Sequence, residues 1–419
     1  MGTTGRRVLF FFPHNPLPPR AGSHLRCVSV LRALAELGCK VTLFGSTALS
    51  NTPWHTPELL AFGRRYGIAT ELHRLTPFDL PLGRVLKRLY RARWVNTPVS
   101  PRLPCPFRMR ERFGQAAQRR DPDVIWMNYV CWDGLLDGLS EHSTRPRVVD
   151  THDLVTLNMQ MQRLLGAELA RLRHAPDRIP ESPILREDYF GQYGLCACPA
   201  EFDILDRYDD TIVLSPEDEE VIRRNTARTR VRTIPMCQEA VGLGNTYTDP
   251  PVMPLGSHMF NLQGLLYFAH RVVPRILHRC PTFACRVTGP LGADPLFPRV
   301  ACLTRLGFVP DLSVVLRGAA YAVCPAFGGT GQPVKIVEAM AHGLAVVAPR
   351  GPAASTPLRH GVSGFVAADA AEFAEHCLRL GSDRGLCRRM GEAARAAVAS
   401  QYPPGRLLEG VADVLTNAG

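Results

Sequence analysis

Apolar runs alternate with helical patterns along most of the chain. Residues 7–12 are mainly apolar, as expected of a buried strand. Residues 25–37 then place leucine or valine at every third position, and Gly38 ends this helical pattern. A second apolar run follows at residues 40–46. The pattern therefore predicts a strand, a helix and a second strand at the start of the chain.

The same alternation returns further along. Residues 121–130 and 145–153 are typical of strands. Residues 209–225 indicate a strand followed by a helix, with Ser215 as its N-cap and Pro216 at its first position. The chain thus repeats a strand-and-helix unit, which is typical of a parallel sheet with functional sites at the carboxyl ends of its strands.

A proline-rich connection at residues 246–254 separates this series from a second series of strands and helices. The chain has 419 residues, enough for two domains of about 150 residues or more. We predict an amino-terminal domain at residues 1–245 and a carboxyl-terminal domain at residues 246–403.

Composition narrows the class of protein. Hydrophobic residues make up 46% of the chain and charged residues 21%, which is ordinary for a soluble globular protein. No segment approaches the ~18 apolar residues of a membrane span, and no cleavage site follows the first apolar run, which we interpret as a strand and not as a signal peptide. The 13 cysteines form no CxxC pair, which favours reduced thiols in a cytoplasmic protein. The net charge of +11 favours anionic partners without selecting one.

A basic segment spans residues 84–120, where eleven residues are Arg or Lys and Glu111 is the only acid. Aromatic and leucine residues are interleaved with the charges. One interpretation is a solvated basic face on helices that pack through these apolar residues, and another is weak contact with an anionic membrane surface. Four prolines argue against one continuous amphipathic membrane helix. We expect no nucleic-acid partner, because no binding motif accompanies the charge.

The stretch GGTGQPVKIVEAMAHG at residues 328–343 combines a glycine-rich loop with the start of an apolar helix. Such a loop lets backbone N–H groups approach an anion, and the helix N-terminus adds a partial positive charge. Lys335 adds a full charge, and Glu338 lies on the same side of the helix. A carboxylate there can accept hydrogen bonds from a vicinal diol such as that of a ribose. The alternative is a surface loop with a solvated acid, but Glu338 is embedded in an apolar pattern. We therefore predict a site for a nucleoside diphosphate.

Residues 328–349, followed by HGVSGFV at residues 360–366, resemble the carboxyl-terminal motif of GT-B glycosyltransferases of family 4, the glycosyl transferases group 1 type. Residues 13–44 resemble the amino-terminal loop and first helix of that family, and VVDTHD at residues 148–153 resembles its HD segment. The resemblance extends over nearly the whole chain. It implies an α/β protein of the GT-B fold, with two Rossmann-like domains facing a central cleft and a last helix, from about residue 404, that packs back on the first domain.

On the donor side, the resemblance assigns roles to individual residues. Glu338 matches the glutamate that holds the ribose, whereas Thr330 stands where the family has a first glutamate that contacts the donor sugar, so the sugar is not implied. The family's Arg/Lys pair is missing, and we expect Lys335 to supply the charge on the β-phosphate, with Arg286 as a second candidate. The other donor-binding positions implied are Gly329, Gly331, Gln332, Gly256, Ser257, Gly307, Phe308 and Val309.

In the amino-terminal domain, Gly22 and Ser23 stand where the family has a glycine loop near the diphosphate or the acceptor. His152 matches the family histidine near the reacting sugar. Asp153 either orients His152 or caps the next helix. We expect His152, Asp153 and Lys335 to be the catalytic residues.

These residues imply a retaining glycosyltransferase that uses a nucleoside diphosphate sugar. We expect no metal and no cofactor, because the sequence has no DxD-type ligand cluster at a predicted strand end. The preferred acceptor is a soluble small molecule with a hydroxyl, amine or thiol nucleophile. The alternatives are a membrane-surface enzyme of lipid-linked or exopolysaccharide assembly, a non-catalytic sugar-nucleotide-binding protein, and a sugar-nucleotide epimerase. We expect a cytoplasmic location, with membrane association in the first alternative.

Overall fold

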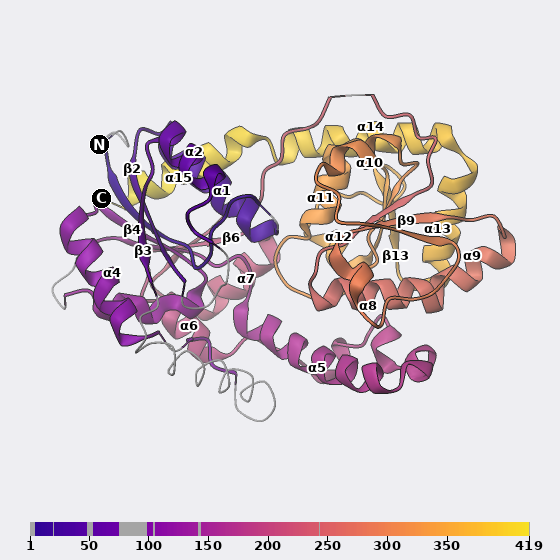
Figure 1. Ribbon diagram of the computed structural model, residues 1–419, viewed down its shortest axis with the longest axis horizontal. Coiled ribbons are helices and arrows are strands. Elements are labelled where there is room, and N and C mark those ends of the chain that lie inside the picture. Colours follow the sequence, from indigo (N-terminus) through magenta and orange to yellow (C-terminus); the bar gives the residue numbers. More distant parts are fainter. Residues whose placement is uncertain are drawn as a thin grey trace. The chain divides into compact units, whose positions relative to one another are not determined.

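The computed structural model describes residues 5–19, 21–47, 53–74, 99–103, 105–140, 144–242 and 244–418 (Figure 1). The chain folds into two compact units. Unit 1 consists of Met1–Met159, Cys196–Met236 and Gly405–Gly419, and unit 2 consists of Gln160–Leu195 and Cys237–Pro404.

The unit boundaries differ from the domain boundaries predicted above. Residues 160–195 belong to unit 2, because Leu165, Leu169 and Leu172 are buried in its hydrophobic core. The break after unit 1 lies at Met236 instead of residue 245. These assignments depend on packing partners, which the proline-rich connection does not reveal.

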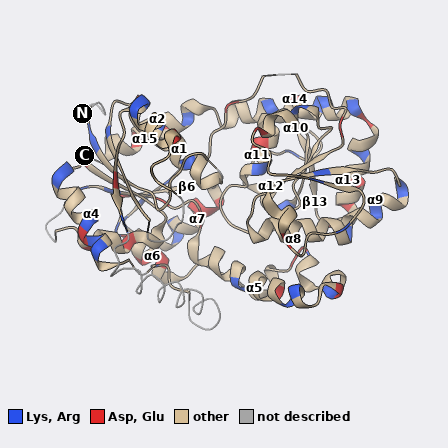
Figure 2. Cartoon of the chain, in the orientation of Figure 1, with Lys and Arg blue, Asp and Glu red and all other residues tan. Residues whose placement is uncertain are grey.

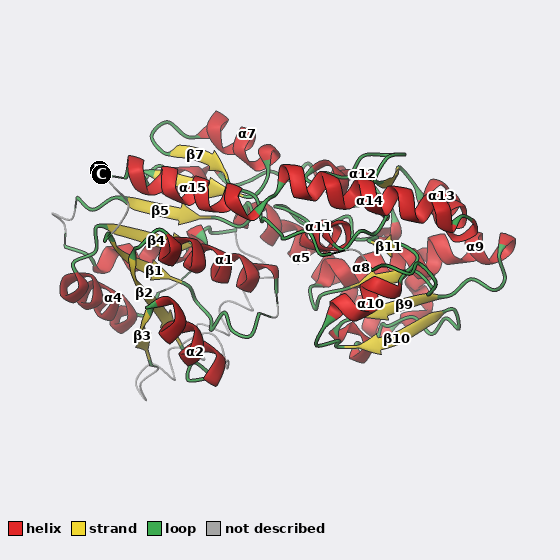
Figure 3. Ribbon diagram, turned by 90° about the horizontal axis from the view of Figure 1, so that it is seen from above, coloured by secondary structure: helices red, strands yellow, loops and turns green. Residues whose placement is uncertain are grey.

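Unit 1 is built on a parallel sheet with strand order β3-β2-β1-β4-β5-β6-β7 (Figure 3). Its strands are β1 (Arg7–Phe11), β2 (Lys40–Ser46), β3 (Ala69–His73), β4 (Val124–Asn128), β5 (Arg147–Asp150), β6 (Asp210–Val213) and β7 (Arg230–Thr233). Its helices are α1 (Gly22–Glu36), α2 (Pro57–Tyr66), α4 (Phe107–Arg120), the 3₁₀ helix η1 (Val130–Gly138), the start of α5 (Val155–His174), α6 (Pro199–Leu205), α7 (Pro216–Asn225) and most of α15 (Pro404–Asn417). The strand, helix and strand predicted at the start of the chain are confirmed as β1, α1 and β2.

Local sequence explains where these helices begin. The Ser215 side chain accepts a hydrogen bond from the backbone N–H of Asp218 at 3.2 Å, and Pro216 opens helix α7, as predicted. Thr56 caps α2 in the same way, and Gly67 ends that helix in a left-handed conformation. The basic segment predicted at residues 84–120 is described only in part: residues 84–98 and 104 lie outside the described residues, and α4 forms its carboxyl-terminal end.

Unit 2 has its own parallel sheet, with strand order β10-β9-β8-β11-β12-β13. Its strands are β8 (Val252–Pro254), β9 (Cys285–Thr288), β10 (Leu303–Gly307), β11 (Ala322–Val323), β12 (Val346–Pro349) and β13 (Gly364–Ala367). Its helices are the rest of α5, α8 (Met259–Tyr267), α9 (Val273–Arg279), α10 (Leu312–Gly318), α11 (Val334–Ala341), α12 (Arg350–Ala354), α13 (Ala370–Ser382) and α14 (Arg384–Gln401). Short 3₁₀ helices occur at Pro176–Glu181, Pro183–Leu185, Gly191–Tyr193 and Pro290–Ala293, and a π-helical turn joins α8 to α9 at Phe268–Val272.

Each unit therefore has a Rossmann-like parallel sheet with helices between its strands, which confirms the α/β class predicted from the sequence. Each unit also has its own core of aliphatic and aromatic side chains. Within the described part of the chain, no helix has both the length and the apolar character that crossing a membrane requires.

Candidate functional site

In the sheet of unit 2, the strand order reverses between β8 and β11. From β8 the chain continues to β9 and β10 on one side, whereas β11, β12 and β13 lie on the other side. In open parallel sheets, ligands bind at the carboxyl ends of the strands where the order reverses. Two loops leave this point: residues 255–258 after β8, and residues 324–333 after β11. They contain Gly256 and Ser257 of the predicted site and all of its GGTG residues.

Close packing holds the second loop against helix α8. A Cβ atom on Gly264 would lie 2.7 Å from the backbone N and Cα atoms of Ala326, so only glycine allows this approach. A Cβ atom on Gly328 would lie 2.6 Å from ring atoms of both Phe190 and Phe260. These two rings meet edge to face with their centroids 5.8 Å apart. The loop therefore packs at Gly328 against the rings of Phe190 and Phe260.

Helix α11 follows this loop and carries the two charged residues of the predicted site. The Nζ atom of Lys335 donates to Oε2 of Glu338 at 2.8 Å. The side chain of Lys335 is 39% exposed and that of Glu338 is 19% exposed, so both reach solvent. No side chain caps the start of α11 at Pro333. The N–H of Ile336 donates to the carbonyl oxygen of Pro333, whereas those of Val334 and Lys335 have no partner among the described residues and can bind an anion, together with the positive end of the helix dipole.

Thr330 and Gln332 lie inward in the same loop. The hydroxyl oxygen of Thr330 is buried and has no hydrogen-bond partner among the described residues. Gln332 is 8% exposed. Gly329 and Gly331 have φ values of 108° and 76°, in the region that favours glycine. The loop thus combines two left-handed glycines with one buried hydroxyl that is free to bond a ligand.

The end of strand β10 lies beside the ends of β8 and β9. The N–H of Gly289, after β9, donates to the carbonyl oxygen of Gly307 at 2.6 Å, and a Cβ atom on Gly289 would collide with the carbonyl oxygen of Leu255. Phe308 follows Gly307 and is 68% exposed, and the neighbouring Val309 is half-buried. An exposed aromatic ring at this edge is suited to stack on a flat ring of a ligand.

Arg286, the second candidate for the β-phosphate, has another partner. Its Nη2 atom donates to the carboxylate of Asp249 at 2.7 Å. Arg286 pairs in register with Val252, the first residue of β8, whereas the two loops leave from the carboxyl ends of β8 and β11. Lys335 is therefore the better placed of the two cations.

In unit 1, the strand order reverses between β1 and β4. The chain leaves β1 through residues 12–21 and enters α1 at Gly22, with Ser23 in its first turn. His152 follows β5, which is adjacent to β4. The predicted residues Gly22, Ser23 and His152 thus all belong to segments that begin at or beside the switch point of this sheet.

The imidazole of His152 is enclosed by its neighbours. His152 is 7% exposed and has a φ of 63°, which is rare for a residue with a side chain. Its ring stacks on that of Tyr129, with the centroids 4.3 Å apart and the planes at 17°. Its Nε2 atom lies 2.9 Å from Oδ1 of Asn128. Burial lowers the pKa of His152 to about 4, so the ring is neutral at neutral pH.

Among the described residues, the carboxylate of Asp153 makes no hydrogen bond to the ring of His152 or to the backbone at the start of α5. Its carboxylate accepts a hydrogen bond from Nδ2 of Asn158 at 2.7 Å. The start of α5 is bound instead by Glu201, which accepts from the backbone N–H groups of Val155 and Thr156 at 2.8 and 2.9 Å. Burial raises the pKa of Asp153 to about 7, with further contributions from the charges of Glu201 and Asp218.

Sequence reasoning missed two residues that contact the ring of His152 and a buried ion pair next to it. Asn128 and Tyr129 contact its ring, and Asp150, two residues before it, forms a buried ion pair with Arg26 of α1 at 2.7 Å. Arg26 lies inside the helical pattern of residues 25–37, but so do Arg32 and Glu36, and the sequence does not show which of them is buried. Nothing in the sequence connects Asn128 or Tyr129 with His152.

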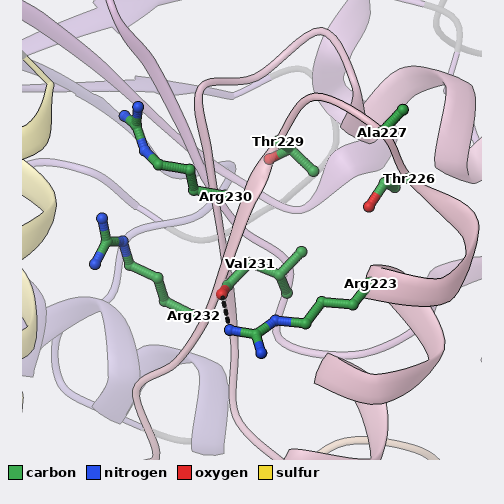
Figure 4. A pocket seen from close by; sticks show the side chains of 7 residues that line it. All are labelled: Arg223, Thr226, Ala227, Thr229, Arg230, Val231 and Arg232. Carbon is green, nitrogen blue, oxygen red and sulfur yellow. Dashed lines mark hydrogen bonds between the residues drawn. The ribbon is translucent and has the colours of Figure 1, made fainter.

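The predicted residues thus fall into one group in each unit. Gly22, Ser23, His152 and Asp153 belong to unit 1, and the other eleven belong to unit 2. A separate pocket in unit 1, lined by Arg223, Thr226, Ala227, Thr229, Arg230, Val231 and Arg232, contains none of them (Figure 4).

Among the described residues, no group of three or more His, Cys, Asp or Glu side chains could hold a metal ion. The absence of a metal or cofactor requirement stays a prediction.

Comparison with known proteins shows the fold of the chain and a family similarity in part of it. Residues 250–383 match the family model described as Glycosyl transferases group 1. No curated protein matches the chain in sequence.

Solved structures match the chain over nearly its whole length. A sucrose-phosphate synthase from Thermosynechococcus elongatus is 17% identical with a TM-score of 0.65, and the match covers 97% of this chain and 96% of that one. HepE from Anabaena, in complex with UDP-glucose, is 14% identical with a TM-score of 0.61, over 98% and 99% of the two chains. TarM of S. aureus, in complex with Fondaparinux, alpha-GlcNAc-glycerol and UDP, is 10% identical with a TM-score of 0.63, also over 98% and 99%. At these identities the structural matches show a common fold. The chain thus has the GT-B fold of these neighbours, and its residues 250–383 are similar to the glycosyl transferases group 1 family.

Proposed function

We propose that the protein transfers a glycosyl group from a uridine diphosphate sugar to a soluble small-molecule acceptor, with retention of the anomeric configuration. The observation that carries this proposal is the arrangement at the switch point of unit 2, where the GGTG loop and the uncapped start of α11 adjoin the Lys335–Glu338 pair. HepE and TarM, which share the fold, have been crystallised with uridine nucleotides, and this supports uridine as the base.

The diphosphate would bind the N–H groups of the GGTG loop and of the first turn of α11. Lys335 would add its positive charge at the β-phosphate, where negative charge develops as the glycosidic bond breaks. Glu338 uses Oε2 to bind Lys335, which leaves Oε1 to accept hydrogen bonds from the ribose hydroxyls. The ion pair would thus hold the ammonium and the carboxylate in place before the donor arrives.

Retention is explained by attack on the same face of the sugar from which the diphosphate leaves. The bond from the anomeric carbon to the phosphate oxygen breaks, the bond to the acceptor nucleophile forms, and the proton of the nucleophile passes to the departing phosphate oxygen. We assign His152 and Asp153 to the reacting-sugar side of the site.

Release of UDP tests the proposal. Purified protein with UDP-sugars and no acceptor should release UDP slowly by hydrolysis, and thermal unfolding should shift upward with UDP more than with GDP, ADP or dTDP. Glu338→Ala and Lys335→Ala should each reduce the shift. Glu375→Ala is a matched control, because Glu375 forms an exposed ion pair with Arg279 in the same unit. Wild-type shifts in both site variants would refute this donor site.

A second candidate acceptor is a lipid-linked sugar at a membrane surface. Helix α4, which carries several arginines (Figure 2), favours this acceptor. Phe107 is 63% exposed at the start of this helix, and Arg108 and Arg112 are also exposed. Co-sedimentation with anionic phospholipid vesicles distinguishes the two acceptors. Strong binding that is lost in Phe107→Ser would favour the membrane acceptor, and the absence of binding would favour the soluble one.

A further inference from the structure

His152 follows strand β5, and the residues around its ring come from the ends of the adjacent strand β4 and of β1 next to it. Asn128 ends strand β4, Tyr129 follows it, and Phe11 ends strand β1. Tyr129 and His152 both have left-handed backbones, with φ values of 64° and 63°, and their rings stack. Such backbone conformations persist only where surrounding contacts stabilise them. The position of the imidazole is therefore fixed by tertiary contacts.

The orientation of the Asn128 amide follows from its second contact. Its Nδ2 atom donates to the backbone carbonyl oxygen of Phe11 at 2.8 Å. A carbonyl oxygen can only accept, so the NH₂ group of Asn128 must face Phe11 and its Oδ1 atom must face His152. Asn128 is fully buried, and these two contacts are its side-chain hydrogen bonds to described residues.

The orientation of this amide determines where His152 carries its proton. Oδ1 of Asn128 can only accept, and Nε2 of His152 lies 2.9 Å from it. Nε2 must therefore be the protonated nitrogen of the ring. In a neutral imidazole, Nδ1 then has a free lone pair, and this atom makes no hydrogen bond to a described residue.

The charges near His152 leave the ring neutral. The carboxylate of Asp150 favours a cationic ring and the guanidinium of Arg26 disfavours it, and these two groups bind each other. Burial is the larger effect and lowers the pKa of His152 to about 4. The other acids nearby in unit 1, Asp153 and Glu201, are engaged by Asn158 and by the start of α5.

We propose that Asn128 is a positioning residue that fixes His152 as the Nε2–H tautomer, so that Nδ1 accepts a hydrogen bond from a hydroxyl group of the bound sugar or acceptor. The second half of this statement rests on the proposed function, whereas the first half does not. If the proton were on Nδ1, this atom would donate a hydrogen bond to the hydroxyl oxygen and could not accept one from the hydroxyl group.

The first test is the tautomer itself. Long-range ¹H–¹⁵N spectra of ¹⁵N-histidine-labelled protein at pH 7, with His152→Gln to assign the signal, should show His152 with its proton on Nε2 alone. A proton on Nδ1, a mixture of tautomers or a cationic ring would overturn the inference. This measurement needs no substrate, so it stands even if no UDP is released.

The second test is kinetic. Asn128→Ala should lower kcat for UDP release by on the order of tenfold while the KM for the donor changes less, because a hydrogen bond of about 1.4 kcal/mol is lost. Asn128→Asp keeps the acceptor and should raise the pKa of His152 by about one unit or more. Thr211→Val is the control, since it removes a partly buried hydrogen bond between strand β6 and Thr229, the residue before β7.

Every outcome of these experiments either supports or refutes a positioning role for Asn128. If Asn128→Ala does not fold, Asn128→Asp decides alone, because an unchanged pKa of His152 in that variant would refute contact between the two side chains. A loss of kcat in Thr211→Val as large as that in Asn128→Ala would show that any disturbance of the sheet suffices, and would overturn a positioning role.

Discussion

Arg26 in helix α1 and Asp150 at the end of strand β5 form a buried ion pair, with Nε and Oδ2 2.7 Å apart and side chains 1% and 0% exposed. Arg26 also donates from Nη1 to the backbone carbonyl oxygen of Pro235 at 3.2 Å. The pair thus connects the helix that starts at Gly22 with the strand that leads into His152. This ion pair therefore connects the segment of Gly22 and Ser23 with the segment of His152 and Asp153.

Breaking this pair should destabilise unit 1. Arg26→Met leaves the carboxylate of Asp150 buried and uncompensated, and should lower the free energy of unfolding by about 3–5 kcal/mol. All four tryptophans lie in residues assigned to unit 1, so urea unfolding followed by tryptophan fluorescence reports on this unit. The double variant Arg26→Met with Asp150→Leu removes both charges and should recover most of the loss. A single variant as stable as the wild type would contradict the prediction.

Glu338 should recognise the ribose specifically. If its carboxylate binds the diol, UDP should bind more tightly than 2′-deoxy-UDP, by roughly tenfold, because one hydrogen bond to a charged group is lost. In Glu338→Ala this preference should disappear. Isothermal titration of both nucleotides against both proteins measures the four affinities. A preference that persists in the variant would place the ribose elsewhere.

Asp153 should make unit 1 less stable at high pH. Its pKa is raised to about 7 in the folded protein, above its ordinary value of 3.8, so the folded state holds the proton more tightly. The stability that this proton supplies is present below pH 4 and is lost as the pH rises through 7. Asp153→Asn should therefore stabilise unit 1 at pH 8, by up to about 4 kcal/mol, and have little effect at pH 4.

Tryptophan-monitored urea unfolding at pH 4, 6 and 8 measures this dependence. Asp203→Asn on helix α6 is the control, because Asp203 is exposed and should show no such trend. Equal stabilisation by Asp153→Asn at all three pH values would show that the carboxylate is not protonated in the folded protein.

Gly264 should be required for donor binding. In Gly264→Ala the new methyl group would meet the backbone of Ala326, which cannot move without displacing the GGTG loop. We expect UDP affinity to fall by about tenfold or more, in line with a displaced binding loop. Gly381→Ala in helix α13 is a matched control, since no atom lies within 4 Å of its Cβ position.

The control variant, Gly381→Ala, should be more stable than the wild type and should bind UDP with the same affinity. Gly381→Ala should raise the free energy of unfolding by up to about 1 kcal/mol, because alanine is the better helix former, and leave UDP affinity unchanged. If Gly264→Ala bound UDP as the wild type does, the contact between α8 and the loop would have no part in the site.

Much of the donor side could be predicted from the sequence because its signals are local. The glycines at 328–331, Lys335 and Glu338 lie within a single loop and helix, and helical spacing alone places Lys335 and Glu338 on one side. The ion pair between them follows from that spacing. The same holds for Ser215 and Pro216, whose capping roles involve only neighbouring residues.

The unit 1 side was predicted less completely. His152 was found through its resemblance to a family motif, but Asn128 is 24 residues away and Arg26 is 124 residues from Asp150. The role suggested for Asp153 belongs instead to Asn128 and Glu201. These contacts depend on the order of the strands in the sheet, which cannot be predicted from the spacing of residues along the sequence.

The sequence by itself determined the elements, the parallel α/β class and the donor motif, since periodicity, capping and turn chemistry act over a few residues. Only the tertiary structure decided that residues 160–195 pack in unit 2, that α8 supports the glycine loop and that Asn128 orients His152. Burial and hydrogen bonding of these groups depend on which distant segments the folded chain brings together, and those contacts exist only once the sheets have formed.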